Sequence, residues 1–198
     1  MHQSLIRRSF FYFAQSVVHP RRCFSLLKQE STFSVGFFLN ALKWVLCEFY
    51  VYYLYATDQV FFIRPWLNIP EDQYRFYQLF FYIPVGILLW IFNAGVVQTL
   101  STALGGKGTF TDTLNICGIV VFTPFVFIDT IDMLFIILNG GDWNIVFNTI
   151  TRTLLVLYGS FLLVMGLMEM HDLKLIKSIL IALIMVPLGI FVTLIFVR

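Results

Sequence analysis

Five stretches of this chain are each long and apolar enough to cross a lipid bilayer as a helix. They cover about residues 36–56, 77–102, 113–138, 145–169 and 174–197. A spanning helix needs roughly 20 mostly apolar residues, because it crosses about 30 Å of hydrocarbon at about 1.5 Å per residue. An irregular segment cannot cross lipid, since its backbone N–H and C=O groups would stay unpaired. The sequence therefore predicts an all-α integral membrane bundle of five transmembrane helices.

Charged residues are too few for a water-soluble fold. They make up 12% of the chain and hydrophobic residues 59%, whereas a typical soluble domain is roughly 25% charged. A soluble protein of 198 residues needs a charged shell that this chain cannot supply. The composition therefore excludes an ordinary soluble enzyme, a disordered chain and a nucleic-acid binder, and it indicates an integral membrane protein.

The cysteines give no sign of a metal or disulfide site. Cys23, Cys47 and Cys117 lie far apart, with no CxxC pair among them. Zinc sites and disulfide frameworks use closely and regularly spaced ligands. We therefore expect these cysteines to be small apolar side chains in or beside the membrane helices, and we expect no metal and no cofactor.

Basic residues are divided unevenly between the two ends of the predicted bundle. Nine of the 13 lie on the N-terminal side: Arg7, Arg8, Arg21, Arg22, Lys28, Lys43, Lys107, Lys174 and Lys177. The opposite side has the remaining four, one of them inside the fourth span: Arg64, Arg75, Arg152 and Arg198. Cytoplasmic loops carry the excess of Lys and Arg. We therefore predict a cytoplasmic N-terminus and, with five spans, a C-terminus outside.

Residues 1–35 form a basic amphipathic segment that precedes the five-helix domain of residues 36–198. Residues 4–18 combine arginine with a Phe- and Tyr-rich face and are too short to span, and Pro20 suits the first turn of a second short helix. Basic amphipathic helices of this kind lie along anionic lipid headgroups. The alternative is a helix packed on the cytoplasmic face of the bundle.

Charged side chains inside a span are costly, so they mark where a buried pair or a site should be sought. Asp129 and Arg152 are equally far from the Gly140–Gly141 turn between the third and fourth spans, which predicts that they lie at the same depth. We expect these two residues to form an ion pair, which Asp132 can share. Such a pair can fix the register of two helices, or it can belong to a proton or ion relay.

Uncharged polar residues accompany the hairpin of the second and third spans. Gln98 and Asn115 are equidistant from the Gly106–Lys107 centre, so we expect a hydrogen bond between them across the hairpin. Asn93 lies deeper, where it can contact another helix or line a cavity. Small residues at a four-residue spacing predict a face for close helix contact: Gly95, Thr99 and Ala103.

Some titratable residues have no predicted partner. Glu48 interrupts the first span, and Lys43 is the nearest opposite charge in the sequence. A protonated, hydrogen-bonded carboxyl group is the simplest interpretation of Glu48. Glu169, His171 and Asp172 lie at the cytoplasmic end of the fourth span and are typical of a membrane boundary, where we expect no metal site.

The glycine-rich loop of residues 104–109 does not meet the requirements of a phosphate-binding loop. A P-loop needs G-x-x-x-x-G-K-[ST] after a strand, whereas residue 101 is serine, residue 108 is glycine and the context is a membrane hairpin. Thr111 or Asp112 is a suitable N-cap for the helix that follows. We interpret the loop motif as a tight turn with unusual backbone angles: Gly105, Gly106, Lys107 and Gly108.

The same loop carries a resemblance to a known family. Residues 103–127, ALGGKGTFTDTLNICGIVVFTPFVF, resemble the hallmark of the Yip (Ypt/Rab-interacting protein) domain family, in which an aliphatic-GGKGSF-like turn precedes a Thr-Leu-like pair and a proline. The matching positions here are Leu104 to Phe110, Thr113, Leu114 and Pro124. Residues 17–42 are similar to the entry segment of the family, and residues 162–188 to its fourth-to-fifth junction.

The resemblance implies a five-helix multipass bundle with a cytoplasmic N-terminus and with no catalytic residues to carry over. Eukaryotic members act in vesicle trafficking, bind Rab-type GTPases and carry a longer polar region before the first span. This chain has instead a short, basic, amphipathic region, which looks like the prokaryotic members and weakens the case for a GTPase partner. The resemblance therefore implies a prokaryotic cell membrane.

Two functional hypotheses are compatible with the sequence. The first is a non-enzymatic membrane protein that organises the bilayer or recruits partners, in contact with anionic headgroups, other membrane proteins or further copies of itself. The second is a small oligomeric transporter or channel that uses intramembrane polar residues: Glu48, Asn93, Asp129, Asp132 and Arg152. An intramembrane enzyme has the least support, because the sequence contains no HExxH or GxSxG motif.

Overall fold

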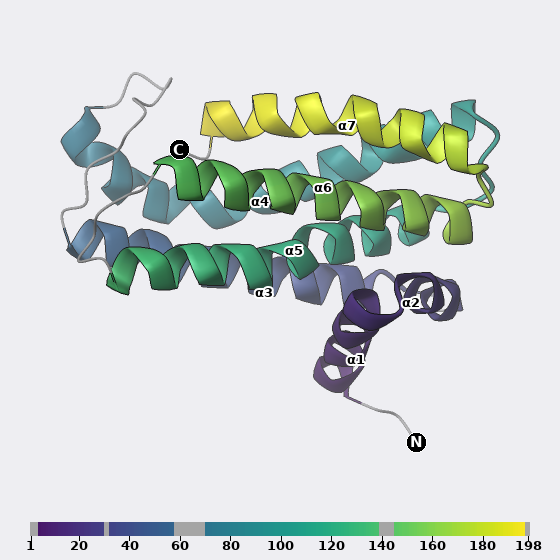
Figure 1. Ribbon diagram of the computed structural model, residues 1–198, viewed down its shortest axis with the longest axis horizontal. Coiled ribbons are helices and arrows are strands. Elements are labelled where there is room, and N and C mark those ends of the chain that lie inside the picture. Colours follow the sequence, from purple (N-terminus) through teal and green to yellow (C-terminus); the bar gives the residue numbers. More distant parts are fainter. Residues whose placement is uncertain (1–3, 30–31, 58–69, 139–144, 197–198) are drawn as a thin grey trace.

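A computed structural model describes residues 4–29, 32–57, 70–138 and 145–196, and within these ranges every regular element is an α-helix. Two short helices come first, α1 (Leu5–Val18) and α2 (Pro20–Leu27). Five long helices follow: α3 (Ser34–Ala56), α4 (Glu71–Ala103), α5 (Phe110–Leu138), α6 (Ile145–Met170) and α7 (Leu175–Phe196). Figure 1 shows the long helices side by side, with α1 and α2 against the bundle. The predicted all-α architecture is confirmed.

The long helices are suited to a bilayer in length and composition. Four contain an apolar stretch sufficient to cross it: Ser34–Tyr53, Phe76–Ala103, Phe110–Phe127 and Thr149–Met170. The 22 residues of α7 extend for about 33 Å, and Leu175–Leu188 forms a shorter apolar stretch within it. The predicted spans match the helices closely, except that α4 begins at Glu71 rather than at residue 77, because polar residues continue the helix beyond the apolar stretch.

The central helix of the bundle is α5. It packs against α3, α4 and α6, and also against α1 and α2, whereas α7 packs against α6 and α4. Ile116 and Ile119 of α5 are fully buried with Leu162 and Leu167 of α6. The α4–α5 turn, which precedes α5, is therefore attached to a helix that is packed on several sides.

A close helix crossing joins α3 to α5 through two glycines. A Cβ atom on Gly118 would lie 2.3 Å from the carbonyl oxygen of Gly36 and 2.4 Å from its Cα atom. Asn115, one turn earlier on α5, accepts a hydrogen bond from the Gly36 N–H at 2.9 Å and donates one to the Thr32 carbonyl at 2.9 Å. Small residues allow two helix backbones to approach in this way.

The small-residue face predicted on α4 makes no such contact with the helices that the structure describes. A Cβ atom on Gly95 would meet nothing within 4 Å, and Thr99 is exposed with its hydroxyl bonded to the Gly95 carbonyl at 2.9 Å. The spacing of small residues identifies a face but not the neighbour that covers it. Close contact through Gly95, Thr99 and Ala103 therefore stays a prediction, and among the described helices Gly36 and Gly118 make such a contact.

The start of α5 is capped reciprocally by Thr109 and Asp112. The Asp112 carboxylate accepts from the Thr109 N–H at 2.7 Å, and the Thr109 hydroxyl accepts from the Asp112 N–H at 3.2 Å. This is a capping box, in which the N-cap and the third helical residue satisfy each other. Thr109 is therefore the N-cap, and the prediction of Thr111 or Asp112 was wrong because Asp112 is the third helical residue, which completes the capping box.

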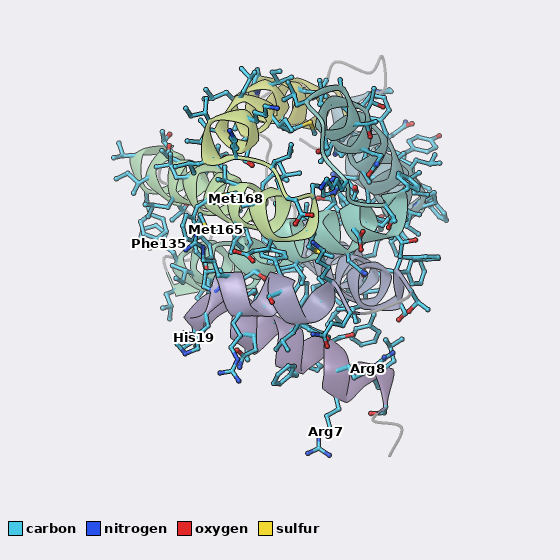
Figure 2. The ribbon with its side chains drawn as sticks, turned by 90° about the vertical axis from the view of Figure 1, so that its right-hand side faces the viewer. Arg7, Arg8, His19, Phe135, Met165 and Met168 are labelled. Atoms are coloured by element: carbon cyan, nitrogen blue, oxygen red, sulfur yellow. The ribbon has the colours of Figure 1, made fainter. Side chains whose placement is uncertain are left out.

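The N-terminal helix α1 packs on the flank of the bundle. Ser9, Tyr12 and Ser16 are buried, and the Ser16 hydroxyl lies 2.8 Å from the Thr123 hydroxyl, midway along α5. Figure 2 shows Arg7 pointing away from the bundle. The contact with the bundle agrees with the second interpretation of this segment, although it lies at the flank rather than at the end face. Contact of the outer side with anionic headgroups stays a prediction.

Candidate functional site

Two helix connections and the end of α2 meet at one end of the bundle. This basic end is defined here by four exposed lysines: Lys28, Lys107, Lys174 and Lys177. The Lys107 N–H donates to the His171 carbonyl at 2.9 Å, and the Lys177 ammonium donates to the Leu104 carbonyl at 2.6 Å. Hydrogen bonds thus join the α4–α5 turn to the α6–α7 turn and to the start of α7.

The end of α2 is tied to the same turns by a lysine. The Lys28 ammonium donates to the Asp172 carboxylate at 2.8 Å and to the Glu169 carbonyl at 3.1 Å. Asp172 has a φ of +56°, a left-handed conformation that aspartate tolerates better than most residues. Hydrogen bonding to Lys28 lowers the pKa of Asp172. The basic end is therefore one connected surface rather than three independent loops.

A polar cluster of Gln98, Thr113 and His171 lies beneath this surface. The Thr113 hydroxyl donates to Gln98 Oε1 at 2.5 Å and lies 3.0 Å from His171 Nε2. Because the single hydroxyl proton is used toward Gln98, the ring must donate from Nε2 to the Thr113 oxygen. Gln98 Nε2 in turn donates to the Gly108 carbonyl at 3.0 Å. The cluster therefore joins α4, α5 and the α6–α7 turn.

His171 is fully buried and fits against a glycine of the loop motif. A Cβ atom on Gly108 would lie 2.6 Å from Cγ of the imidazole ring. Burial lowers the pKa of His171, and Lys28 lowers it further against the opposing charges of Asp112 and Asp172. The ring is therefore neutral at pH 7, in agreement with a single hydrogen on Nε2.

We expect the neutral state of His171 to make stability depend on pH. Because its folded pKa lies below the unfolded value of 6.5, stability is full above that value and falls as pH drops through it. Unfolding of the detergent-purified chain between pH 7.5 and 5 measures this slope, which His171→Gln should flatten. The Asp172 contribution is lost only below about pH 3.8. His19→Gln removes an exposed imidazole as the matched control, and an equal flattening there would contradict the assignment.

Three of the four backbone donors of the loop motif, those of Gly105, Gly106 and Lys107, are used within the protein. The N–H groups of Gly105 and Gly106 bond to the carbonyls of Thr102 and Ser101, at 3.0 and 2.7 Å. The Lys107 and Thr109 N–H groups bond to His171 and Asp112, as described above. A phosphate cradle needs several such donors directed at the ligand. The interpretation of residues 105–108 as a tight turn is supported, and Gly105 has the positive φ, +86°, that favours glycine.

Gln98 bonds across the predicted hairpin, but not to Asn115. Its partners are Thr113 and the Gly108 carbonyl, whereas Asn115 bonds to Gly36 and Thr32. Asn115 lies two positions after Thr113, and each position turns an α-helix by about 100°. Their side chains are therefore about 200° apart around α5. Equal distance from the turn predicts equal depth, but it does not predict the side of the helix on which a residue lies.

Glu48 and Asn93 are not brought together. Glu48 lies beyond the Trp44–Tyr82 ring pair, toward the end of α3, and Asn93 lies on the other side of the Phe37–Trp90 pair, toward the basic end. One side-chain oxygen of each is buried with no hydrogen-bond partner among the described residues. These two residues therefore belong to different regions of the bundle.

The predicted ion pair falls outside the side chains that the structure describes. The described helices include residues 129, 132 and 152, but the side chains of Asp129 and Asp132 are not among those described. The pairing of Asp129 with Arg152 therefore stays a prediction. The structure does describe the side chain of His171, for which the sequence predicts only ordinary boundary chemistry. The only sequence feature that points to this residue is its position after an apolar helix.

Metal binding has no support in the described ranges. They contain no group of three or more His, Cys, Asp or Glu side chains that could bind a metal ion. Cys23, Cys47 and Cys117 are buried and not bonded to each other. Burial raises the pKa of Cys23 to about 12, and its thiol donates to the Tyr12 carbonyl at 3.3 Å.

The loop motif and the helix bundle together match a known family. The family model of the Yip1 domain matches residues 14–196, from within α1 to the end of α7. The chain belongs to the Yip1 domain family. The resemblance found in the loop is thereby confirmed, and this Yip1 domain is an integral multipass membrane protein. Neither a curated protein nor a solved structure matches it.

Proposed function

We propose that this Yip1 domain is a non-enzymatic membrane protein that recruits partners and organises lipid through its basic end. The observation that carries the proposal is the connected surface in which the α4–α5 and α6–α7 turns and the end of α2 are hydrogen-bonded together. Lys107 and Lys174 are exposed on this surface. A basic surface beside a bilayer attracts anionic headgroups and acidic protein surfaces.

The interior of the basic end supports a structural role. The His171 ring bonds to the Thr113 hydroxyl, which in turn donates to the amide oxygen of Gln98. The ring also fits against Gly108, which leaves no room for a substrate between them. Catalysis requires a reactive group with access to its substrate. The buried cluster therefore favours a surface held in one shape over a reaction centre.

The charge distribution supports a cytoplasmic basic end, and the short basic N-terminal segment, which resembles that of prokaryotic family members, supports a prokaryotic cell membrane. Nine of the 13 basic residues lie on the N-terminal side of the spans, and cytoplasmic loops carry the excess of Lys and Arg. The partners are therefore sought on the cytoplasmic side, where anionic lipid headgroups also lie. These partners include other membrane proteins, soluble proteins and further copies of the chain as candidates.

Photo-crosslinking in native membranes tests the recruitment. A crosslinking amino acid at position 107 or 174 should give the same discrete protein adducts, identified by mass spectrometry, because both positions belong to one surface. The matched control is Leu88, which is 65% exposed on the apolar side of α4. Identical adducts from position 88, or lipid adducts alone from all three positions, would show that the basic end recruits no protein.

The second candidate is a small oligomeric transporter or channel. Its motivation is the buried oxygen atoms of Glu48 and Asn93, which have no partner among the described residues. Intramembrane polar residues often line a path for ions or substrates. Ion flux into proteoliposomes that disappears with Glu48→Gln or Asp129→Asn would favour this function over recruitment.

A further inference from the structure

A groove lies where the α1–α2 corner meets α6. Its volume is about 580 Å³, and its lining comes from both elements: Val18, His19, Pro20, Arg21, Arg22, Phe161 and Met165. Basic and apolar residues therefore share one cavity beside a membrane helix. Lipids bind in such places because they present a charged headgroup and an apolar chain together.

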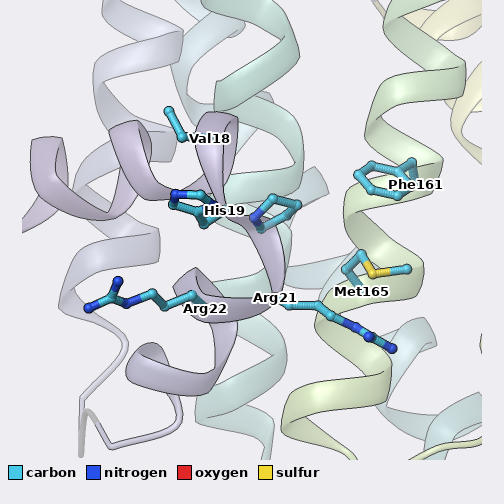
Figure 3. A pocket seen from close by; sticks show the side chains of 7 residues that line it. Val18, His19, Arg21, Arg22, Phe161 and Met165 are labelled. Carbon is cyan, nitrogen blue, oxygen red and sulfur yellow. The ribbon is translucent and has the colours of Figure 1, made fainter.

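The two kinds of lining are arranged along the direction of α6. Residue 165 follows residue 161 toward the end of α6 at Met170, which lies at the basic end. Figure 3 shows Arg21 reaching toward α6 beneath Met165, with Phe161 and Val18 farther from the basic end. Glu169, which contacts Arg21, lies eight positions after Phe161 on α6. At about 1.5 Å per residue, Phe161 is therefore about 12 Å farther from the basic end than Glu169.

Arg21 is oriented by its neighbour while remaining open to solvent. Its Nε atom lies 3.5 Å from the Glu169 carboxylate, and its side chain is 66% exposed. This contact holds the guanidinium toward α6, whereas Arg22 points away from α6 in Figure 3. A guanidinium can bind a phosphate group through two parallel N–H donors. Arg21 is therefore the residue placed to bind an anionic group in the groove.

The start of α2 adds to the positive potential. The helix begins at Pro20 with no side-chain cap, and its first turn contains no acidic residue. Phe161 and Val18 are 46% and 65% exposed, so the apolar part of the groove has no cover from the described side chains. The groove thus combines positive charge near the basic end with exposed apolar surface that lies farther from that end along α6.

We propose that this groove binds one anionic phospholipid, with its phosphate at Arg21 and an acyl chain along Met165, Phe161 and Val18. The proposal deepens the lipid contact of the proposed function, because it assigns that contact to a single site. A zwitterionic lipid fits less well, since its headgroup has no net negative charge to complement Arg21. A bound lipid would also link the α1–α2 corner to α6.

Native mass spectrometry of the full chain in detergent tests the site. Phosphatidylglycerol should be retained more strongly than phosphatidylcholine of the same chain length. Arg21→Gln should weaken the retention of phosphatidylglycerol about fivefold, as expected for one basic group near a membrane surface. Arg7→Gln is the matched control, because it removes the same charge from a side chain that points away from the bundle. Arg21→Lys keeps the charge but not the two parallel donors, so its loss should be smaller than that of Arg21→Gln.

Several outcomes would overturn the proposal. Equal loss with Arg7→Gln and Arg21→Gln would show diffuse attraction, and equal retention of both lipids would show no headgroup selectivity. Displacement of the lipid by glycerol 3-phosphate alone would show a site for a free phosphate ester. Unchanged elution on gel filtration verifies that Arg21→Gln folds. Because protein crosslinking from positions 107 and 174 does not use Arg21, it can succeed or fail independently of the lipid result.

Discussion

Replacing Gly118 with alanine should lower the free energy of unfolding by about 3 kcal/mol or more, because it forces two helix backbones apart. The new Cβ atom would lie 2.3 and 2.4 Å from backbone atoms of Gly36. Backbone atoms cannot rotate away as the end of a side chain can, so α3 must move away from α5. The displacement would also break the hydrogen bond from the Gly36 N–H to Asn115. Unfolding of the purified chain in detergent, followed by circular dichroism, measures the loss.

Gly95→Ala provides the matched control for this prediction. It is the same substitution within a long helix, but the new Cβ atom would meet nothing within 4 Å. Alanine favours the helix over glycine by about 1 kcal/mol, so stability should stay equal or rise slightly. A similar response to the two substitutions would contradict the close crossing of α3 and α5.

The helices of this protein could be predicted from the length of their apolar stretches. A membrane helix must satisfy its own backbone and match the hydrocarbon thickness, so hydropathy determines where it lies in the sequence. The close packing could not be predicted in this way. Gly95 and Gly118 are both small residues in apolar helices, and only the arrangement of neighbouring helices decides that Gly118 faces α3.

The candidate site, like the helix packing, could be predicted from the sequence only in part. The glycine-rich turn and the position of Gln98 beside it followed from local sequence. The partners of Gln98 did not, because the hairpin symmetry predicts depth and not the direction of a side chain around the helix. His171 was missed for a related reason. Its contacts with Thr113 and Gly108 join segments about 60 residues apart, and no local pattern in the sequence reports them.

Truncation of His171 should be the second large loss of stability. His171→Ala removes a fully buried ring, leaves the Thr113 hydroxyl without that partner and opens a cavity, which together should cost about 3 kcal/mol. Gly108→Ala alone should cost about 1–3 kcal/mol, because its Cβ atom would lie 2.6 Å from the ring. Gly108 does not have a positive φ, so this cost comes from the ring and not from backbone strain.

The two substitutions should therefore cost less together than the sum of their separate effects. Once the ring is removed, the Cβ atom at position 108 enters the vacated space, and we expect a coupling energy of about 1–3 kcal/mol in a double-mutant cycle. Gly166→Ala combined with His171→Ala is the control, because a Cβ atom at Gly166 meets Ile116 and Phe24 instead of the ring. That pair should be additive. Additivity of the Gly108 pair as well would mean that the α4–α5 turn does not rest on His171, and the connected basic end would lose its main support.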